Sequence, residues 1–590
     1  MTSKIARQCV ANLATLSFAV PLFCAAIAVT AQAQTPRLTT LYNFCSDISE
    51  GYCTDGSSPY AALIQAANGY LYGTTESGGA NGYGTVFKIN TSGGSATTPL
   101  YSFCSQVGCT DGVQPQGGLL LATDGALYGT TFSGGANTGN GGTVFKITPS
   151  GTLTSLYSFG PPPYTTGANP TGTLVQATNG DLYGTASGQA DSPGGTIFKI
   201  NQSGTSFGLL YTFCPANNCT TGIDPFSGVI QATNGDFYGT AEEGGPGGSS
   251  DGTIFKVAPN GAVSLLYSFC QQTGCADGFN PIGTLVQGSD GNLYGTTYDG
   301  GTYDKGTVFK ITPSGVFQSL YSFCQQVQNG VCTDGEYPVS GLIQATDGNL
   351  YGTTYYGGPN GFFAGTVFKI TTAGPPLTTV YAFCQTTNSE GYCADGSSPT
   401  GGLLQDTNGT FYGTTFAGGP DNGGTIFSLN TGLTPFVSLT VPSNKEGAAV
   451  GILGQGFTGS SVVKFHGVRA ASVTREGATY LSATIPAGAL TGAVTVSTGA
   501  TVLTSNRTFR VTPTFGSFSP PSGPVGTLVT ISGTGLLQAT KVTFNGSSAA
   551  PSVISDTEIT ATVPSGAATG KITVTTQGGS ASSATSFVVD

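Results

Sequence analysis

Short apolar segments separated by glycine-rich turns recur in a fixed order along most of the chain. Each unit opens with Leu-Tyr-x-Phe and continues with an apolar segment that usually ends in Gln. Leu/Phe-Tyr-Gly-Thr and Gly-Thr-Val/Ile-Phe-Lys then follow. Asn-Gly or Asp-Gly separates the second segment from the third, and such pairs favour two-residue hairpin turns because both turn residues need a positive φ. The pattern predicts four short strands in each unit.

Seven units occur, and their first motif is marked by a tyrosine at Tyr42, Tyr101, Tyr157, Tyr211, Tyr267, Tyr321 and Tyr381. About 56 residues with four strands is the size of one propeller blade, so we expect a seven-bladed β-propeller over residues 34–433. The seventh unit ends near Asn430 without a clear copy of the first motif. We therefore expect residues 41–44 to supply the outermost strand of the last blade, which protects the sheet edges. An open β-solenoid is the structural alternative.

Two similar segments follow, at 434–511 and 512–590. Phe465-His466-Gly467 aligns with Phe544-Asn545-Gly546, and both segments have short alternating strands with Gly and Pro turns. Such patterns predict two Ig-like β-sandwich domains, so the fold class is all-β throughout. The alignment with Asn545 places His466, the single histidine, at a strand end, where we interpret it as incidental.

The first 33 residues are typical of a removable export signal. Lys4 and Arg7 precede an apolar stretch, and Ala31-Gln32-Ala33 forms a small-x-small cleavage site. A transmembrane anchor is the alternative, although the apolar stretch is short for that role. No later segment is long and apolar enough to span a bilayer, so no membrane span is expected after cleavage.

Twelve cysteines remain after the signal, and they form six local pairs just after Leu-Tyr-x-Phe. The third unit lacks both members of the pair, as expected for a covalent partnership. In an exported chain these pairs should be disulfides, since their spacing does not match a zinc site. The predicted pairs are Cys45/Cys53, Cys104/Cys109, Cys214/Cys219, Cys270/Cys275, Cys324/Cys332 and Cys384/Cys393.

These motifs resemble those of the Gloeobacter/Verrucomicrobia (GloVer) tandem-repeat proteins over about residues 38–430. The two C-terminal segments are similar to IPT/TIG Ig-like domains, the second more clearly than the first. The resemblance implies an exported, surface or extracellular protein and brings no established activity. In bacterial surface proteins, IPT/TIG modules usually act as spacers or interaction domains.

Alternating strand direction places the loops between strands 2 and 3 on the same face as the cysteine-bearing loops between blades. Binding sites tend to evolve in variable loops on a rigid framework, here one with disulfides, so we predict the binding site on this face. The candidate stacking residues are Tyr298, Tyr303, Tyr355, Tyr356, Phe362 and Phe363. Alternatively, these aromatic side chains cover the blade edges.

Charge excludes one class of partner. The chain has 18 Lys and Arg against 29 Asp and Glu, and residues 38–430 carry a net charge of -17 with no Arg or His. No nucleic acid is expected, because phosphate backbones are bound by clustered Lys and Arg. Six Lys occupy one repeat position and would form either a cationic ring for acidic glycans or strand lysines that extend toward the acidic loops. They are Lys88, Lys146, Lys199, Lys256, Lys310 and Lys369.

Catalytic motifs are weak. Without His or Arg, the repeats lack the usual groups for acid-base relays, Ser-His chemistry or phosphate clamps, so no catalytic residue is assigned. No metal site or cofactor is assigned either, although calcium remains an option on an acidic face. Six Gln end the first strands, where they would either line a central channel or satisfy neighbouring backbone groups. They are Gln65, Gln176, Gln231, Gln287, Gln344 and Gln405.

The sequence therefore predicts a monomeric, exported, non-catalytic binding or scaffold protein for a polysaccharide or a surface protein. A carbohydrate-active hydrolase or lyase that uses propeller carboxylates is the alternative. Two or three carboxylates converging in the channel mouth would favour the enzyme. A channel lined by Gln, Thr and Gly would favour binding.

Overall fold

The computed structural model describes residues 36–49, 51–91, 98–137, 140–160, 165–188, 194–214, 219–246 and 251–590. The expected export signal at 1–33 lies outside these residues. The described chain is all-β, apart from two short 3-10 turns at Val107–Cys109 and Thr273–Cys275. No helix in the described ranges is long and apolar enough to cross a membrane.

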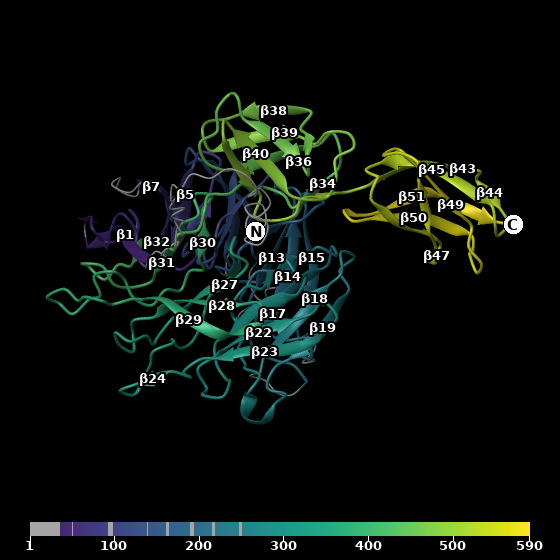
Figure 1. The fold of residues 1–590 in the computed structure, drawn as a ribbon. Helices are drawn as coiled ribbons and strands as arrows, with labels where there is room; N and C mark the ends of the chain where they lie inside the picture. Colours follow the sequence, from purple (N-terminus) through teal and green to yellow (C-terminus); the bar gives the residue numbers. More distant parts are fainter. Residues whose placement is uncertain are drawn as a thin grey trace, which may run out of the picture. The chain divides into compact units, whose positions relative to one another are not determined.

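Seven four-stranded antiparallel sheets, consistent with propeller blades, occupy the repeat region (Figure 1). The first strand of each sheet has only two residues and precedes the Asn-Gly or Asp-Gly turn. These strands are β4 (Ile64–Gln65), β8 (Leu120–Leu121), β12 (Val175–Gln176), β16 (Ile230–Gln231), β20 (Val286–Gln287), β26 (Ile343–Gln344) and β30 (Leu404–Gln405).

The two middle strands of each sheet form its core. The second strands carry Tyr-Gly-Thr and are β5 (Tyr70–Thr75), β9 (Leu127–Thr131), β13 (Leu182–Ala186), β17 (Phe237–Ala241), β21 (Leu293–Thr297), β27 (Leu350–Thr354) and β31 (Phe411–Thr415). The third strands are β6 (Thr85–Asn90), β10 (Thr143–Ile147), β14 (Thr196–Ile200), β18 (Thr253–Val257), β22 (Thr307–Ile311), β28 (Thr366–Thr371) and β32 (Thr425–Asn430). Most residues of these strands are buried, although the Lys or Ser at the fourth position of each third strand is only partly buried.

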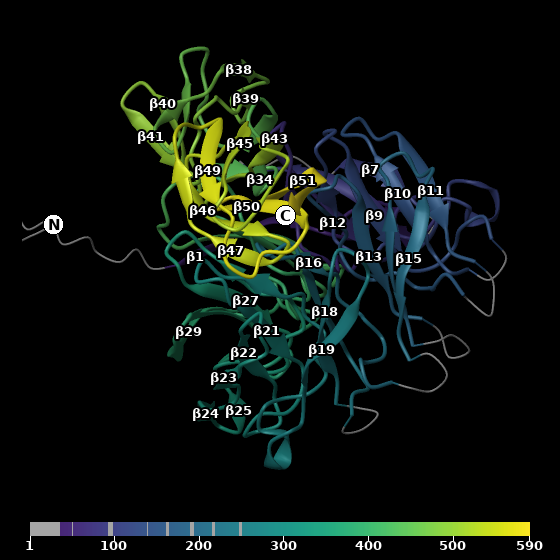
Figure 2. The ribbon, with the colours of Figure 1, turned by 90° about the vertical axis from the view of Figure 1, so that its right-hand side faces the viewer.

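The fourth, outer strands carry Leu-Tyr-x-Phe and are β7 (Thr98–Ser102), β11 (Leu153–Ser158), β15 (Phe207–Thr212), β19 (Val263–Ser268), β23 (Phe317–Ser322) and β29 (Gly374–Ala382). Figure 2 shows one such sheet, with β9, β10 and β11 side by side. The seventh sheet takes its outer strand from the start of the chain. β1 (Arg37–Asn43) pairs antiparallel with β32, which confirms the predicted closure.

A glycine at the centre of each second strand lets the sheets pack. Gly73 faces Phe87 across β5 and β6, and a Cβ on Gly73 would lie 2.6 Å from the Phe87 ring. The corresponding Gly and Phe pairs in the other six sheets approach equally closely. The buried ring therefore takes the space of a side chain, which explains why the Tyr-Gly-Thr motif requires glycine.

The loops between sheets and the loops between strands 2 and 3 lie on one face, as predicted. Isolated bridges join the two loop types in six of the repeats, for example Ser57 with Ser77 and Glu336 with Tyr356. Two cysteine loops also form small hairpins. These are β2 (Ile48–Ser49) with β3 (Tyr52–Cys53), and β24 (Val327–Gln328) with β25 (Val331–Cys332).

The segment after the repeats forms a first β-sandwich with its own core, including Ile452, Phe465 and Phe509. One sheet has the order β33 (Ser438–Leu439), β35 (Ala449–Leu453), β39 (Tyr480–Thr484) and β38 (Ser472–Arg475). The other has the order β37 (Val468–Arg469), β36 (Val462–Phe465), β40 (Val494–Thr498) and β41 (Thr501–Thr504). β34 (Ser443–Asn444) pairs with β42 (Arg510–Val511).

The last segment repeats this topology. One sheet has the order β43 (Thr514–Ser519), β45 (Leu528–Thr534), β49 (Glu558–Thr562) and β48 (Pro551–Val553). The other has the order β44 (Ser522–Gly523), β51 (Gly579–Val589), β50 (Gly570–Thr576), β46 (Ala539–Phe544) and β47 (Ser547–Ala549). His466 and Asn545 occupy equivalent turns with φ of 44° and 45°, in agreement with their alignment.

Candidate functional site

A cavity of about 770 Å³ lies among the first strands of the seven sheets. Seven of its lining residues share one repeat position, directly after a proline. They are Tyr60, Gln116, Thr171, Phe226, Ile282, Val339 and Thr400. No Asp, Glu, Lys or Arg from the described part of the seven sheets lines the cavity. Arg507 and Arg510, from the segment after the repeats, also line it, and the Arg510 guanidinium donates to the Thr233 carbonyl of a hairpin turn.

The backbone that presents these seven residues is the same in every repeat. The residue before each proline has a φ between 51° and 56°, a region that few residue types adopt readily. In the fourth repeat, the Asp224 amide donates to the Gly194 carbonyl of the preceding sheet, at 2.8 Å. The Asp224 carbonyl accepts from the Glu242 amide, at 2.9 Å. Equivalent pairs of bonds recur in the other repeats.

Seven further residues follow the Tyr-Gly-Thr strands and are held by the second of these bonds. We call them, together with the seven residues after the prolines, the mouth residues. They are Glu76, Phe132, Ser187, Glu242, Tyr298, Tyr355 and Phe416. Their backbone is fixed, yet their side chains differ in charge, size and polarity from one repeat to the next. A constant scaffold with variable side chains is suited to recognition.

Five of the six predicted stacking aromatics form ring contacts within one region, with Tyr337 as the connecting residue. Tyr356 lies 4.3 Å from Tyr355, 4.9 Å from Phe362 and 5.3 Å from Phe363, measured between ring centroids. Tyr337 lies 4.9 Å from Tyr298 and 6.1 Å from Tyr356. We call these six residues the aromatic cluster.

Exposure differs within the aromatic cluster. Phe362 and Phe363 are 43% and 64% exposed, while the four tyrosines are half-buried. Tyr303 is also exposed, but it makes no ring contact with the other predicted aromatics in the described structure. Because exposed aromatic rings on a rigid base offer flat apolar faces, the two phenylalanines are the accessible part of the cluster.

All six predicted disulfides are present, and each closes a loop on the same face as the aromatic cluster. They are Cys45–Cys53, Cys104–Cys109, Cys214–Cys219, Cys270–Cys275, Cys324–Cys332 and Cys384–Cys393. The loops are short, with the two cysteines of a pair five to nine residues apart. The predicted pairing is therefore confirmed at all twelve positions.

Sequence reasoning missed a second role of the later cysteine in each pair. It assigned Cys219 and Cys393 a disulfide only, whereas the carbonyl of each also accepts two backbone hydrogen bonds. Cys219 accepts from the amides of Gly222 at 3.1 Å and Gly245 at 2.9 Å. Cys393 accepts from the next glycine in its own loop at 3.1 Å and from the Gly419 amide at 2.8 Å, and the other four pairs repeat this arrangement. Because Gly245 and Gly419 lie in loops between strands 2 and 3, these carbonyls join the two loop types.

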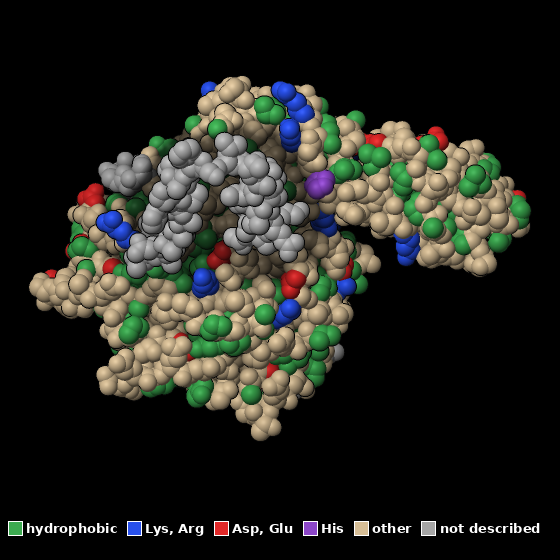
Figure 3. Space-filling model, in the orientation of Figure 1, with side chains coloured by type: hydrophobic (Ala, Val, Ile, Leu, Met, Phe, Trp, Pro, Cys, Tyr) green, Lys and Arg blue, Asp and Glu red, His purple; other side chains and the backbone are tan. Residues whose placement is uncertain are grey.

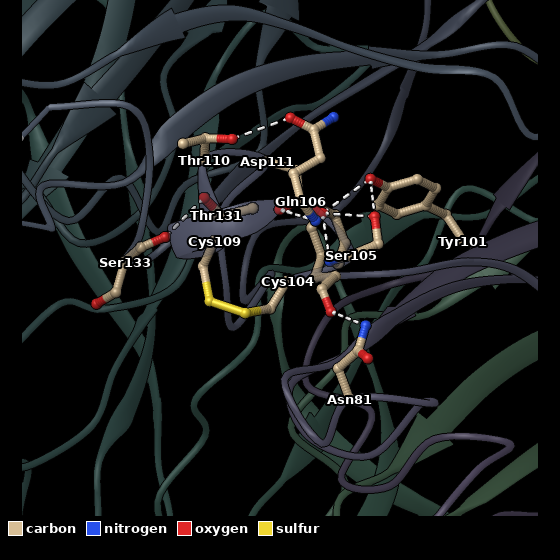
Figure 4. Close-up of a disulfide and its surroundings, with 11 residues drawn as sticks. Asn81, Tyr101, Cys104, Ser105, Gln106, Cys109, Thr110, Asp111, Thr131 and Ser133 are labelled. Atoms are coloured by element: carbon tan, nitrogen blue, oxygen red, sulfur yellow. Dashed lines mark hydrogen bonds between the residues drawn. A yellow bond between two sulfur atoms is a disulfide. The ribbon is translucent and has the colours of Figure 1, made fainter.

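An aspartate, buried in four cases and half-buried at Asp395, lies beside five of the six disulfides. Figure 4 shows the Cys104–Cys109 loop, in which Asp111 accepts hydrogen bonds from the Tyr101 hydroxyl at 2.8 Å and from the Ser105 amide at 2.9 Å. The same Tyr–Asp bond recurs in four other loops. The Cys214–Cys219 loop is the exception, because Thr221 takes the place of the aspartate. Five loops are therefore anchored both covalently and by hydrogen bonds to an aspartate that is buried or half-buried.

Burial and mutual repulsion shift the pKa of several groups at the mouth. Burial, together with the nearby Glu243, raises the pKa of Asp224 to about 6. Burial, with Asp224, Glu243 and Asp299, raises the pKa of Glu242 to about 7. Burial also raises the pKa of Tyr60 to about 12, with contributions from Glu76 and Glu242. These shifts indicate partly desolvated acidic groups that repel one another.

The glutamines and lysines have structural partners. The side-chain oxygen of Gln287 accepts from the Thr233 amide of the preceding sheet, at 2.8 Å, and each of the other five glutamines bonds in the same way. Lys146, Lys256 and Lys310 pair with aspartates of the hairpin turns. These carboxylates belong to the hairpin turns and not to the disulfide-bonded loops. The prediction that these lysines extend toward the acidic loops was therefore wrong.

No group of three or more His, Cys, Asp or Glu side chains in the described ranges is arranged to hold a metal ion. Figure 3 shows charged side chains scattered over a mainly uncharged face. The mouth residues were missed as a set by sequence reasoning. Their signal is that the side chain varies at two fixed positions, after Pro and after Tyr-Gly-Thr-Thr/Ala, while the neighbouring residues repeat.

The Gloeobacter/Verrucomicrobia repeat model matches residues 27–248 and 224–455, and the IPT/TIG domain model matches residues 513–589. The chain therefore belongs to the Gloeobacter/Verrucomicrobia repeat family and carries a C-terminal IPT/TIG domain. No curated protein matches the sequence.

Among solved structures, a fungal AA5-family alcohol oxidase in complex with copper is 13% identical, with a TM-score of 0.43 over 81% of this chain and 98% of that chain. An oligogalacturonate lyase in complex with manganese is 11% identical, with a TM-score of 0.39 over 67% and 98%. A surface glycan-binding protein from Prevotella bryantii is 16% identical, with a TM-score of 0.20 over 25% and 38%. Similarity at this level carries no functional argument.

Proposed function

We propose that this Gloeobacter/Verrucomicrobia repeat protein is an exported, non-catalytic binding protein of the cell surface or extracellular space. Residues 34–433 form a seven-bladed propeller, and residues 434–511 and 512–590 form two IPT/TIG-like modules that act as spacers. The bound partner is a polysaccharide. Six disulfides support export, because such bonds persist outside the cytoplasm.

The aromatic cluster is the observation that carries this proposal. Sugar rings have apolar faces, and the exposed rings of Phe362 and Phe363 offer complementary flat surfaces. The Tyr356 ring contacts both phenylalanine rings, and the Cys324–Cys332 disulfide closes the neighbouring loop. A rigid platform loses little conformational entropy when it binds a ligand.

The lining of the cavity supports binding over catalysis. Thr, Gln, Ser, Gly and aliphatic side chains of the seven sheets surround it together with Tyr60 and Phe226, and no carboxylate of their described residues is among them. A glycosidase needs two carboxyl groups placed on either side of the scissile bond. Asp224 and Glu242 lie in the loops at the mouth and are the carboxyl groups that a hydrolase or lyase would use.

A glycan array with the mature chain, residues 34–590, tests the proposal, with release of reducing sugar and of unsaturated products measured in parallel. We expect retention of at least one polysaccharide without product formation. A Phe362→Ala/Phe363→Ala variant should bind at least tenfold more weakly, about 1.4 kcal/mol. Tyr303→Ala, an exposed aromatic outside the cluster, is the matched control. Absence of glycan binding, or product release that is lost in Glu242→Gln, would overturn the proposal.

A further inference from the structure

The first β-sandwich contacts hairpin turns on both sides of the cavity. The Thr479 hydroxyl donates to the Ala67 carbonyl in the turn of the first sheet, at 2.9 Å. Gln455 donates to the corresponding turn of the seventh sheet, also at 2.9 Å. The Arg510 guanidinium donates to the Thr233 carbonyl in the turn of the fourth sheet. In a closed ring of seven sheets, the fourth lies opposite the junction of the seventh with the first. The sandwich therefore covers one end of the cavity, which we call the covered end.

One loop of this sandwich lines the covered end. Residues 505–508, between β41 and β42, all belong to the lining of the cavity. The backbone of the loop is held in place, because the Ser505 hydroxyl donates to the Arg507 carbonyl at 2.7 Å and the Phe509 amide donates to the Gly492 carbonyl at 2.9 Å. The Phe509 side chain is fully buried in the core of the sandwich. The sandwich therefore fixes the position of the Arg507 backbone at the covered end.

The Arg507 guanidinium has no partner in the described chain. It forms no hydrogen bond with another described residue, and the ion pairs among the described residues all involve lysines. The side chain is exposed and lines the cavity, yet the surrounding protein displaces enough water to lower the guanidinium pKa. An arginine nevertheless stays protonated in a protein. Because a partly desolvated charge without a partner is unfavourable, Arg507 gains when an anion binds.

The rest of the lining suits the uncharged part of a sugar. Asn506 and Thr508 flank Arg507, and neither side chain forms a hydrogen bond with another described residue. The rings of Tyr60 and Phe226 belong to the same lining and offer flat apolar surfaces. A volume of about 770 Å³ lies within the range of small-ligand sites, roughly 300 to 1,000 Å³. The cavity therefore has room for a short stretch of a glycan.

The acidic charge of the sheets is concentrated away from the covered end. Glu242 directly follows β17, whereas Thr233 lies in the turn before this strand. The five residues of β17 span about 17 Å, and physiological salt largely screens exposed charges beyond about 8 Å. Lysines pair with three of the aspartates that lie in the hairpin turns, which are Asp124, Asp236 and Asp290. No described residue that lines the cavity carries a carboxylate, so Arg507 determines the local charge together with Arg510.

We propose that Arg507 binds the carboxylate of an acidic sugar within a glycan that occupies the cavity. The first β-sandwich then completes the binding site in addition to acting as a spacer. This proposal deepens the proposed function and rests on it. A planar guanidinium can donate two parallel hydrogen bonds to a carboxylate, an interaction that a neutral sugar does not offer. The Arg510 guanidinium is already bonded to Thr233, so Arg507 is the arginine whose donors are all free.

Calorimetric titration of the mature chain, residues 34–590, with uronic-acid oligosaccharides tests this inference. The probes are oligomers of glucuronic, mannuronic and galacturonic acid, each compared with its carboxyl-reduced form. Reduction keeps the rings and linkages but replaces each carboxylate with a primary alcohol. We expect at least one acidic oligomer to bind at least tenfold more tightly than its reduced form. Arg507→Gln should remove most of this preference. Arg507→Lys should keep part of it, because an ammonium group keeps the charge but lacks the planar pair of donors.

Arg469→Gln is the matched control, because Arg469 is another exposed arginine of the first β-sandwich and is not part of the cavity lining. It should leave the preference unchanged. Phe362→Ala/Phe363→Ala should weaken the acidic and reduced forms by the same factor, since stacking on an aromatic ring does not depend on the carboxylate. Melting curves show that each variant is folded.

Equal affinity for the acidic and reduced forms, or a preference that persists in Arg507→Gln, would overturn this inference and leave the proposed function standing. Binding of triglutamate or of sulfated dextran, without binding of any uronic-acid oligomer, would assign the cavity to another anion and overturn it as well. Binding of no oligomer in either form overturns it too, and only an empty glycan array would extend that failure to the proposed function.

Discussion

Gln65 donates from its side-chain nitrogen to the Thr407 hydroxyl at 2.9 Å, across 342 residues of sequence. The Thr407 amide in turn donates to the Gln65 side-chain oxygen. This pair links the seventh sheet to the first, beside the bond from the Thr414 hydroxyl to the Ala61 carbonyl. The ring of sheets is therefore closed twice, by β1 within the last sheet and by side chains between the last sheet and the first.

The second repeat has Leu121 where the other six have glutamine, so one junction between sheets lacks this bond. We predict that Leu121→Gln stabilises the chain by about 1 kcal/mol, because the new side chain can accept from the Ala67 amide. Gln287→Leu should destabilise it by about 1 to 2 kcal/mol, since the Thr233 amide loses its acceptor. Thermal unfolding of both variants measures the effect. If both variants changed the melting temperature equally and in the same direction, the glutamine bonds would not stabilise the junctions between sheets.

Each disulfide should stabilise the folded chain mainly because it restricts the conformations of the unfolded chain. Removal of the Cys270–Cys275 bond by Cys→Ala substitution at both positions should cost about 2 kcal/mol, on the chain-entropy model for a short loop. The third repeat, with Gly160 at the first cysteine position, is a natural example without the bond. Denaturant unfolding with and without reductant checks the prediction. A double variant as stable as the parent chain would show that this disulfide contributes nothing to the free energy of unfolding.

The buried Tyr–Asp bonds should differ in strength according to the acceptor. Tyr267 donates to Asp277, which is fully buried, at 2.7 Å, whereas Tyr211 is bonded to the Thr221 hydroxyl at 2.8 Å. Tyr267→Phe should cost about 1.5 to 3 kcal/mol, because a hydrogen bond to a charged group is lost. Tyr211→Phe should cost about 0.5 to 1.5 kcal/mol. Equal losses in unfolding free energy would mean that the charge of Asp277 adds nothing.

The raised pKa values at the mouth predict a pH dependence of stability. Asp224 and Glu242 titrate near 6 and 7 in the folded chain, above their usual values of 3.8 and 4.5. The folded state therefore binds more protons between about pH 4 and 7, so these groups favour folding at low pH and lose that contribution as the pH rises. Glu242→Gln should stabilise the chain at pH 8 by about 1 to 3 kcal/mol and flatten the profile.

Melting temperatures from pH 5 to pH 8 test this last expectation, with Glu390→Gln as the exposed control. A profile for Glu242→Gln that is parallel to that of the parent chain would show that Glu242 does not titrate in this range.

The sequence predicted the local features well because each depends on residues close together in the chain. Asn-Gly turns, alternating strands and paired cysteines lie within one repeat, and all six disulfides were correctly paired. The carbonyl bonds of Cys219 and Cys393 were not predicted, because backbone hydrogen bonds between loops leave no mark in residue type. The closing strand was predicted because the seventh repeat lacks its own Leu-Tyr-x-Phe. The aromatic candidates were chosen from loop position alone, which could not separate Tyr303 from the cluster or add Tyr337.

By itself, then, the sequence determined the repeat, its strands and turns, its disulfides and the family. Only the tertiary structure decided that Tyr60, Gln116 and Phe226 line one cavity, since these residues come from three different sheets. It also decided that the glutamines bond to neighbouring sheets and that three of them, Gln231, Gln287 and Gln344, line the cavity as well. The physical reason is that ring closure brings equivalent positions, about 56 residues apart, around a common axis, where their side chains interact whatever their separation in sequence.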